Sequence, residues 1–342
     1  MKAVVKEEKG VGFKIKEVDY PRLGPEEVII QVKCVGICGT DIPIYEGVRE
    51  VPLPLIPGHE FSGVIVEKGK DVKEFEIGDR VSARLVISCD KCSFCKSGYE
   101  SLCEDIVEIG IDINGAFAEY VAVPYKVVHH LPEKLSFEDG ASIDPIASAY
   151  RFIRKVSVTT ADAVVIIGPG PIGLYALQIA VAEGAKKAII VGAKGDESRL
   201  EVAKDLGASK TVNICQEDAL EKIKEYTNGT MADVVVEATG NPAAVDFALN
   251  SAKKGGRVVL GGIFHKLSEI EPGKIVRKEL KVFGSFCYSS TDFSECIELL
   301  LNKKVETKKV ITHILPLEKI EEGIKLVKRK EAIKVILKPG GS

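Results

Sequence analysis

Hydrophobic and polar positions alternate over short distances in the first part of the chain. From residue 1 to about residue 140, brief runs of β-branched residues are separated by glycine and proline. This pattern is typical of β-strands joined by turns. The expected strands are residues 28–35, 61–66, 80–86 and 118–123. The segment is therefore predicted to form an all-β, barrel-like domain.

The pattern changes after Ser142, where buried-type apolar runs alternate with longer helical stretches. This order indicates βαβ units and a doubly wound parallel sheet of the Rossmann type. Expected strands are 163–167, 188–191, 234–237, 257–260 and 281–283, and expected helices are 172–183, 198–206 and 243–252. A short strand beyond residue 300, a helix at 317–328 and a strand at 333–337 are expected to return to the first domain.

These patterns predict an α/β protein of two domains, which agrees with a length of 342 residues. Residues 1–150 and 295–342 are expected to form the β-rich domain, with a cysteine lobe at 89–103. Residues 151–294 are expected to form the second domain, built on the parallel sheet. The formal net charge of −3 offers no basic field for a nucleic acid. With no apolar run long enough to span a bilayer and no signal peptide, a cytoplasmic location without a membrane partner is expected.

A glycine-rich turn follows the apolar strand at 163–167. The glycines Gly168, Gly170 and Gly173 have G-x-G-x-x-G spacing, with Pro171 and Ile172 between the last two, and an apolar helix follows. The first glycine permits the tight turn, the second lets a pyrophosphate approach the backbone, and the third lets helix and strand pack closely. A plain turn is the alternative, but the strand before it and the helix after it favour a dinucleotide site.

The end of the next strand bears on the choice of cofactor. An acidic residue is expected there if the adenosine ribose carries a free 2′-hydroxyl. The chain instead continues as Gly192, Ala193 and Lys194, with Asp196 later and Arg199 in the following helix. A cation at this place suits a 2′-phosphate, so we favour NADP(H) over NAD(H). The alternative is that Lys194 is a solvated loop charge and Asp196 binds the ribose.

Four cysteines form a compact group: Cys89, Cys92, Cys95 and Cys103. Thiolates at this spacing can close a tetrahedron around Zn²⁺ and leave no open position, which is typical of a structural site. An iron–sulfur cluster is the alternative, because four thiolates can also hold one. A nucleic-acid-binding zinc module is disfavoured by the acidic charge balance.

A second set of metal-ligand types comes from separate segments. Cys38 follows an expected strand, and His59 and Glu60 follow Pro57 and Gly58. Thiolate, imidazole and carboxylate together suit zinc. By themselves these residues are weak evidence of a metal site, because a lone buried cysteine or histidine is common in protein cores.

At these positions the sequence resembles the zinc-containing medium-chain alcohol and polyol dehydrogenases. The resemblance rests on the blocks at 38–41, 58–63, 78–81 and 115–120, with Gly69 and Val72. It covers essentially the whole chain and is nearest to the sorbitol, threonine and galactitol-phosphate dehydrogenase branch. It implies a GroES-like catalytic domain beside the Rossmann domain, one catalytic and one structural zinc, and a homo-oligomer, either tetramer or dimer.

The resemblance also implies roles for individual residues. Cys38, His59 and Asp144 are expected to bind the catalytic zinc, and Glu60 is expected to be a fourth ligand that substrate or water displaces. Zinc would then act as a Lewis acid on the substrate oxygen. Thr40 is expected to pass on the hydroxyl proton, although it can also cap a helix start.

Two positions depart from the family pattern. Many relatives have a histidine where this chain has Pro43, so the proton relay must end elsewhere. Cys287 replaces an arginine that binds substrate hydroxyls in sorbitol dehydrogenases. The resemblance therefore implies hydride transfer between NAD(P) and a small-molecule secondary alcohol or ketone, with a sugar alcohol, polyol or polyol phosphate favoured. L-Threonine or a simple secondary alcohol is the alternative substrate, and a non-catalytic nucleotide-binding protein is the alternative class.

Overall fold

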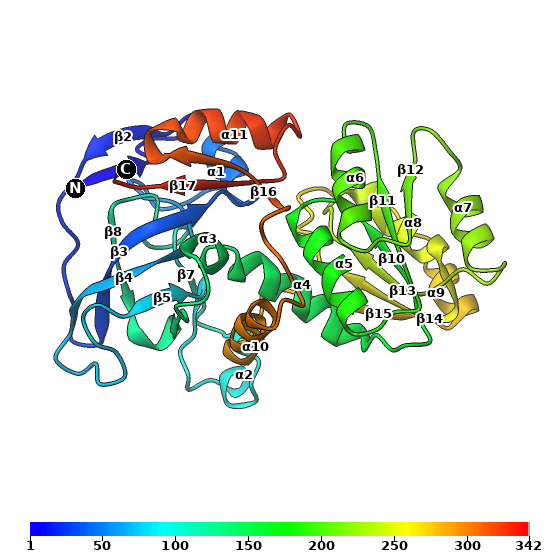
Figure 1. Cartoon of the computed structure of the whole chain (residues 1–342), viewed down its shortest axis with the longest axis horizontal. Helices are drawn as coiled ribbons and strands as arrows, with labels where there is room; N and C mark the ends of the chain where they lie inside the picture. Colours follow the sequence, from blue (N-terminus) through cyan, green and yellow to red (C-terminus); the bar gives the residue numbers. More distant parts are fainter. Residues whose placement is uncertain (341–342) are drawn as a thin grey trace. The chain divides into compact units, whose positions relative to one another are not determined.

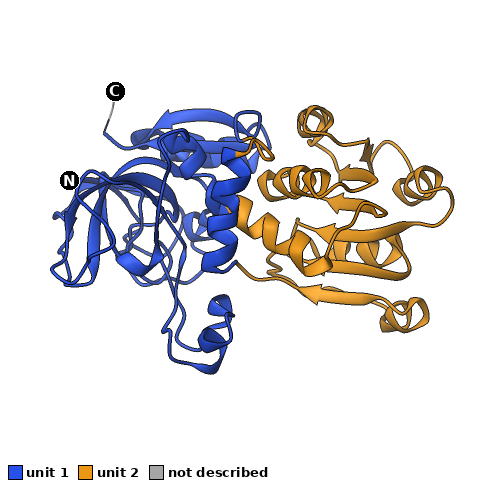
Figure 2. Cartoon of the chain, turned by 60° about the horizontal axis from the view of Figure 1, so that its bottom comes forward, with its two compact units in different colours: residues 1–144, 288–301, 307–342 blue, residues 145–287, 302–306 orange. Residues whose placement is uncertain are grey.

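The chain folds into two compact units in a computed structural model that describes residues 1–340. The first unit contains Met1–Asp144, Tyr288–Leu301 and the chain from Thr307 onward, and the second contains Pro145–Cys287 and Asn302–Glu306. Figure 2 colours the two units. The expected boundary after residue 150 falls inside helix α4 (Ile143–Val156), which begins in the first unit and continues in the second.

A seven-stranded sheet is the main element of the first unit (Figure 1). Its order is β16-β17-β3-β4-β5-β9, with β8 also paired to β3. All pairs are antiparallel except β16 with β17, which run parallel. The strands are β3 (Glu27–Gly36), β4 (Glu60–Lys68), β5 (Arg80–Ala83), β8 (Tyr120–Pro124), β9 (Val128–His130), β16 (Ile311–Pro316) and β17 (Lys334–Lys338).

Two short hairpins and several short helices complete the first unit. The hairpins pair β1 (Lys2–Val5) with β2 (Lys14–Glu17) and β6 (Val86–Ile87) with β7 (Val107–Glu108). The α-helices are α1 (Asp41–Glu46), α2 (Ser93–Lys96), α3 (Phe137–Gly140), α10 (Ser290–Leu301) and α11 (Ile320–Lys328), and the 3₁₀ turns are η1 (Glu100–Leu102), η2 (Tyr125–Val127) and η3 (Leu317–Lys319).

The second unit is built on a six-stranded parallel sheet in the order β12-β11-β10-β13-β14-β15. Its strands are β10 (Ala163–Ile167), β11 (Lys187–Gly192), β12 (Lys210–Asn213), β13 (Ala232–Glu237), β14 (Ala252–Leu260) and β15 (Lys281–Gly284). The intervening helices are α5 (Pro171–Ala182), α6 (Glu197–Asp205), α7 (Ala219–Tyr226), α8 (Pro242–Ser251) and α9 (Pro272–Lys278). The strand order reverses between β10 and β13, and ligands of such sheets bind at the carboxyl ends beside this point.

Burial explains why these strands were recognisable in the sequence. Every residue of β10 is buried, as expected for a central parallel strand covered on both faces. The β-rich domain and the parallel Rossmann-type sheet are both confirmed. Among residues 1–340, every helix is too short or too polar to cross a bilayer.

Some elements differ from the sequence-based expectation. Residues 80–86 are not one strand, because the chain leaves β5 at Arg84 and Leu85 before β6 begins. Several elements were not predicted, among them helices α1, α4, α9 and α10 and strands β1, β2, β9 and β12. The signal for α4 was present, because Ile146, Ile153 and Val156 are buried at helical spacing.

Candidate active site and metal centres

Cys38 lies where the chain leaves β3 and turns into α1. Its backbone N–H donates to the Asp41 carboxylate at 2.8 Å, and its Sγ lies 3.1 Å from Thr40 Oγ1. Thr40 occupies the N-cap of α1, but its side chain makes no capping hydrogen bond. The Thr40 hydroxyl is therefore turned to the thiol rather than to the helix backbone.

His59 and Glu60 reach the same place from the start of β4. Gly58 precedes them with a φ of +93°, and a side chain there would lie 2.5 Å from the Phe117 ring. Strand pairing places Glu60 opposite Gly36, at the end of β3. As a result, ligand atoms of Cys38, His59 and Glu60 all lie within 4.8 Å of one another.

These polar groups are almost completely withdrawn from solvent. His59 and Glu60 are each 2% exposed. Among the described residues, His59 Nδ1 is a buried atom without a hydrogen-bond partner. Burial raises the pKa of the Cys38 thiol and of the neighbouring Asp41 carboxyl. A bound cation would compensate this cost and would hold Cys38 as a thiolate, so the donor set fits zinc.

Lys334 of β17 is a buried partner of this site that the sequence analysis did not identify. It is 1% exposed, and its ammonium donates to the Glu60 carboxylate and to the Ile37 carbonyl at 3.0 Å. Burial lowers the pKa of Lys334 to about 8. A lysine among the apolar residues of a predicted strand was the only sequence signal for this contact.

Asp144 stands beside this set but is not part of it. Its carboxylate accepts a hydrogen bond from the Tyr288 hydroxyl, and burial raises the pKa of the Asp144 carboxyl. Its carboxylate is not among the ligand atoms that lie within 4.8 Å of one another around Cys38, His59 and Glu60. Tyr288 is a second residue that sequence reasoning missed, because it lies 144 positions away from its partner.

The four cysteines of the lobe come together as predicted from their spacing. Ligand atoms of Cys89, Cys92, Cys95 and Cys103 lie within 4.8 Å of one another, and all four are free thiols. The sulfur of Cys95 lies 3.4 Å from that of Cys92 and 4.0 Å from that of Cys89. Two thiolates on one tetrahedral zinc lie about 3.8 Å apart, given Zn–S bonds of about 2.3 Å.

Backbone groups also prepare the lobe for a metal. N–H groups of Cys95 and Glu104 donate to the Cys92 sulfur and lower its pKa to about 6. This favours the thiolate form that metals require at Cys92, whereas burial and the neighbouring thiols raise the pKa of Cys95 to about 12. The lobe therefore fits a closed four-thiolate zinc site.

The glycine-rich turn joins β10 to α5 in the second unit. Gly168 has a φ of +99°, and a side chain at Gly173 would lie 1.8 Å from the Gly168 carbonyl oxygen. By contrast, a side chain at Gly170 would meet nothing within 4 Å. Pro171 begins the helix, as is favourable at a helix N-terminus. The open space at Gly170 is where a pyrophosphate could approach the backbone.

An ion pair between Asp196 and Arg199 follows the end of β11. The Ala193 N–H donates to the Asp196 carboxylate at 3.0 Å, and Arg199 lies 3.5 Å from the same group. Asp196 and Arg199 are buried, whereas Lys194 is exposed. Burial lowers the pKa of Arg199. Of the cations at this strand end, Lys194 is thus the one facing solvent.

Glu237 is a further buried acid that the sequence analysis overlooked. It ends β13 and is fully buried, where its carboxylate accepts the N–H groups of Thr239 at 2.7 Å and Gly240 at 3.1 Å. Its position after an apolar strand was the available signal. The contacts fix the loop at the carboxyl end of β13, beside the reversal of strand order.

Comparison with known proteins agrees with both units. Residues 24–133 match the alcohol dehydrogenase GroES-like domain, and residues 171–302 match the zinc-binding dehydrogenase domain. The chain is 38% identical over 99% of both chains to a sorbitol dehydrogenase from Halalkalibacterium halodurans. It is 36% identical, again over 99% of both chains, to an L-threonine 3-dehydrogenase from Bacillus velezensis.

A solved structure has the same fold. The chain matches the crystal structure of a zinc-binding dehydrogenase from Sinorhizobium meliloti 1021 bound to NADP, with a TM-score of 0.92, 31% identity and 99% coverage of both chains. Fold, metal-ligand geometry and these similarities define a zinc-dependent oxidoreductase. The chain belongs to the zinc-dependent medium-chain alcohol and polyol dehydrogenase family.

Proposed function

We propose that this protein transfers hydride between NAD(P) and the carbinol or keto carbon of a sugar alcohol, polyol or polyol phosphate. The observation that carries the proposal is the convergence of Cys38, which is half-buried, with the buried His59 and Glu60 within 4.8 Å. The partnerless His59 Nδ1 supports it, because burying such a group without a metal would be costly. A non-catalytic nucleotide-binding protein would have no need to keep this set.

Each residue of the site has a distinct proposed role. Cys38 and His59 would hold the catalytic zinc, and Glu60 would be a ligand exchanged for substrate or water. We propose Asp144 as the remaining ligand, although its carboxylate lies outside the set of ligand atoms that are within 4.8 Å of one another. When bound, zinc supplies Lewis acidity toward the substrate oxygen. The Thr40 hydroxyl, 3.1 Å from Cys38 Sγ, would accept the substrate hydroxyl proton. Pro43 has no group to carry this proton further.

The cofactor would lie on the turn formed by Gly168, Gly170, Pro171, Ile172 and Gly173, with the adenosine end near Gly192, Ala193, Lys194 and Arg199. We favour NADP(H). The exposed Lys194 supports this choice, since the Asp196 carboxylate is already engaged by the Ala193 N–H. Lys194→Ala should therefore reduce the preference for NADP⁺ over NAD⁺, and unchanged discrimination would contradict the assignment.

Turnover assays test the substrate class. Sorbitol, galactitol, galactitol 1-phosphate, L-threonine and 2-butanol are compared with NAD⁺ and NADP⁺, and reduced nicotinamide is followed by absorbance. We expect the polyols or their phosphates to give the highest kcat/KM, and Cys38→Ala to abolish turnover. Faster oxidation of L-threonine would favour the second candidate, which the similarity to L-threonine 3-dehydrogenase supports.

We further propose that the protein works as a cytoplasmic homo-oligomer, a tetramer or dimer. Strand β15 is an edge of the parallel sheet, and its Val282 is 37% exposed. Such apolar edges are commonly covered by a second chain. Light scattering coupled to size-exclusion chromatography measures the assembly.

A further inference from the structure

The first unit contains a set of hydrogen bonds, joined by short stretches of backbone, that connects the four-cysteine lobe to Asp144. It passes through groups that have no place in the proposed reaction, and all of them lie in the same compact unit. Its central member is Tyr288, which is 1% exposed. The Tyr288 hydroxyl donates to the Asp144 carboxylate and accepts the Leu85 N–H at 3.3 Å.

Tyr288 has little freedom to move away from this position. Its ring packs against Phe293 of α10 at a centroid distance of 5.8 Å. The next residue, Ser289, fixes the start of α10, because its N–H and hydroxyl both donate to Asp292 at 2.8 Å. The hydroxyl therefore presents a fixed donor to Asp144.

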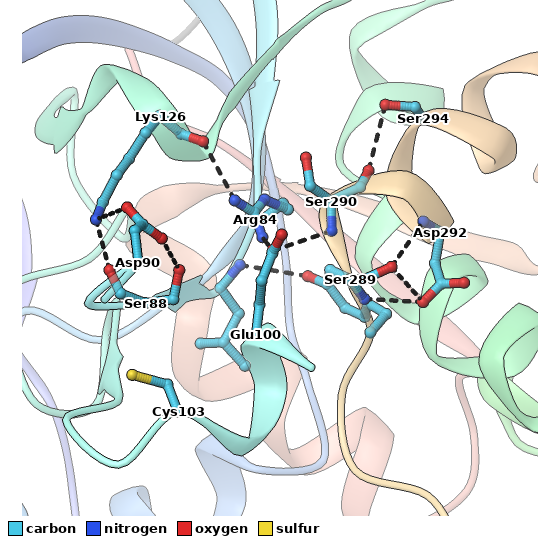
Figure 3. A network of polar contacts seen from close by, with 12 residues as sticks. Arg84, Ser88, Asp90, Glu100, Cys103, Lys126, Ser289, Ser290, Asp292 and Ser294 are labelled. Atoms are coloured by element: carbon cyan, nitrogen blue, oxygen red, sulfur yellow. Dashed lines mark hydrogen bonds and ion pairs between the residues drawn. The ribbon is translucent and has the colours of Figure 1, made fainter. Parts of the chain in front are cut away.

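The lobe contacts both chain segments that hold Tyr288. Glu100 lies between Cys95 and Cys103, and its carboxylate accepts hydrogen bonds from the Arg84 guanidinium and from the Ser290 N–H at 3.2 Å. Figure 3 shows Glu100 between these two groups. Arg84 directly precedes Leu85, and Ser290 follows Tyr288 by two positions. One carboxylate of the lobe thus joins the segment that binds the Tyr288 hydroxyl to the segment that carries Tyr288.

The ion pair between Arg84 and Glu100 is largely shielded from solvent. Arg84 is 4% exposed, and its guanidinium also donates to the Lys126 carbonyl at 3.2 Å. A fold in which a buried arginine loses its carboxylate partner is strongly destabilised. Arg84 and Glu100 are therefore expected to stay paired whenever the lobe is folded around its metal.

We propose that Tyr288 is a positioning residue that sets where the Asp144 carboxylate stands at the catalytic metal, and that Glu100 ties this residue to the four-cysteine lobe. The proposal rests on the function proposed above, in which Asp144 belongs to the catalytic zinc site. It gives the lobe a role beyond local stability, because a metal held there keeps Glu100 in place and thereby orients a ligand of the other metal.

Metal affinity tests the proposal independently of turnover. Tyr288→Phe removes only the hydroxyl, and competition with a chromophoric chelator measures the dissociation constants of both zinc ions. Partners that orient metal ligands are worth about 10- to 100-fold in metal affinity, so we expect a weakening of this size at the catalytic site alone. Tyr226→Phe is the matched control, since its hydroxyl donates at 2.9 Å to the Ser209 carbonyl in the second unit.

Glu100→Gln tests the contribution of the lobe. Because Glu100 acts on Asp144 only through Tyr288, losing its charged hydrogen bond should weaken zinc affinity at the catalytic site by about 3- to 10-fold. The lobe should retain its zinc. Glu104→Gln is the control, because Glu104 is an exposed acid of the same lobe. If Glu100→Gln releases the lobe metal, Arg84→Lys replaces it as the test, since it loosens the same contact from outside the lobe.

A spectroscopic signature separates positioning from general destabilisation. With zinc in the lobe and cobalt in the catalytic site, the visible bands report the ligand geometry around the cobalt. We expect shifted bands in Tyr288→Phe and Glu100→Gln, and unchanged bands in both controls. Unchanged bands and an affinity within about twofold of wild type in Tyr288→Phe would overturn the proposal.

Asp144→Asn tests the proposed zinc ligand set separately from the role of Tyr288. If it leaves the metal affinity of the catalytic site unchanged, Asp144 is not part of that site, and the proposed ligand set and the role of Tyr288 both fail. If Asp144→Asn weakens the site but Tyr288→Phe does not, only the role of Tyr288 is overturned.

Discussion

At the scale of single residues, the candidate catalytic site depends on charges that are buried but paired. Lys334 and Glu60 show this most clearly, because each is at most 2% exposed and each is the other's ionic partner. Burying two charges is favourable only when their mutual contact is kept. The pair therefore restricts which substitutions this part of the molecule tolerates.

Lys334→Met should lower the free energy of unfolding by about 3–5 kcal/mol, because it leaves the Glu60 carboxylate buried without its cation. The double variant Lys334→Met/Glu60→Gln should recover a large part of this loss. Urea unfolding of the wild type and both variants, all without bound metal, measures the effect. A double variant no more stable than Lys334→Met would show that the two charges are not energetically coupled.

His129 predicts a pH dependence of stability. Burial lowers its pKa to about 4, with Arg84 and His130 as further positive neighbours. Since an unfolded histidine titrates near 6.5, the stabilising contribution is fully present above that pH and is lost as the pH falls toward 4. The loss from this residue should reach about 2 kcal/mol between pH 7 and pH 5.

His129→Gln has no ring to titrate and should therefore lose less stability than wild type over the same pH interval. Chemical denaturation at pH 7 and pH 5 gives the comparison. Equal losses of unfolding free energy in the two proteins would mean that the pKa of His129 is not lowered in the folded state.

At the scale of elements, the turn between β10 and α5 separates folding from binding. Gly173 has no room for a side chain, whereas Gly170 faces open space. We expect Gly173→Ala to lower the free energy of unfolding by more than about 2 kcal/mol, because its new methyl group would meet the Gly168 carbonyl. Gly170→Ala should stay within about 0.5 kcal/mol of wild type.

Cofactor affinity should fall in Gly170→Ala, although the stability of this variant should be unchanged. In Gly170→Ala, the methyl group would stand where the pyrophosphate approaches the backbone, so NAD(P)H should bind at least about tenfold more weakly. Quenching of tyrosine fluorescence, or the enhanced emission of bound nicotinamide, measures the dissociation constant of NAD(P)H. Wild-type affinity in Gly170→Ala would place the pyrophosphate elsewhere on the second unit.

At the scale of the whole molecule, the two sets of ligands predict the metal content. Purified protein should contain about two zinc ions per chain, and Cys103→Ser and Cys38→Ser should each reduce this to about one. Cys103→Ser should also lower Tm, since a structural zinc contributes directly to folding. Elemental analysis checks the count. Iron in place of zinc in the lobe would revive the iron–sulfur alternative.

Local sequence determined much of this protein. Strand β10 and the glycines after it were recognisable because a buried parallel strand and a phosphate-binding turn require particular residues at adjacent positions. The same holds for the four cysteines at 89–103, whose ligands come from one short segment. Helix α4 was not predicted, although its buried residues Ile146, Ile153 and Val156 have helical spacing.

The tertiary structure decided what surrounds each of these features. Lys334 reaches Glu60 across 274 positions and Tyr288 reaches Asp144 across 144, and no local pattern in the sequence encodes either contact. The separation of Asp144 from the set formed by Cys38, His59 and Glu60 is likewise a property of the folded chain. Sequence periodicity specifies which face of an element is buried, but only the packed fold specifies which distant group meets it there.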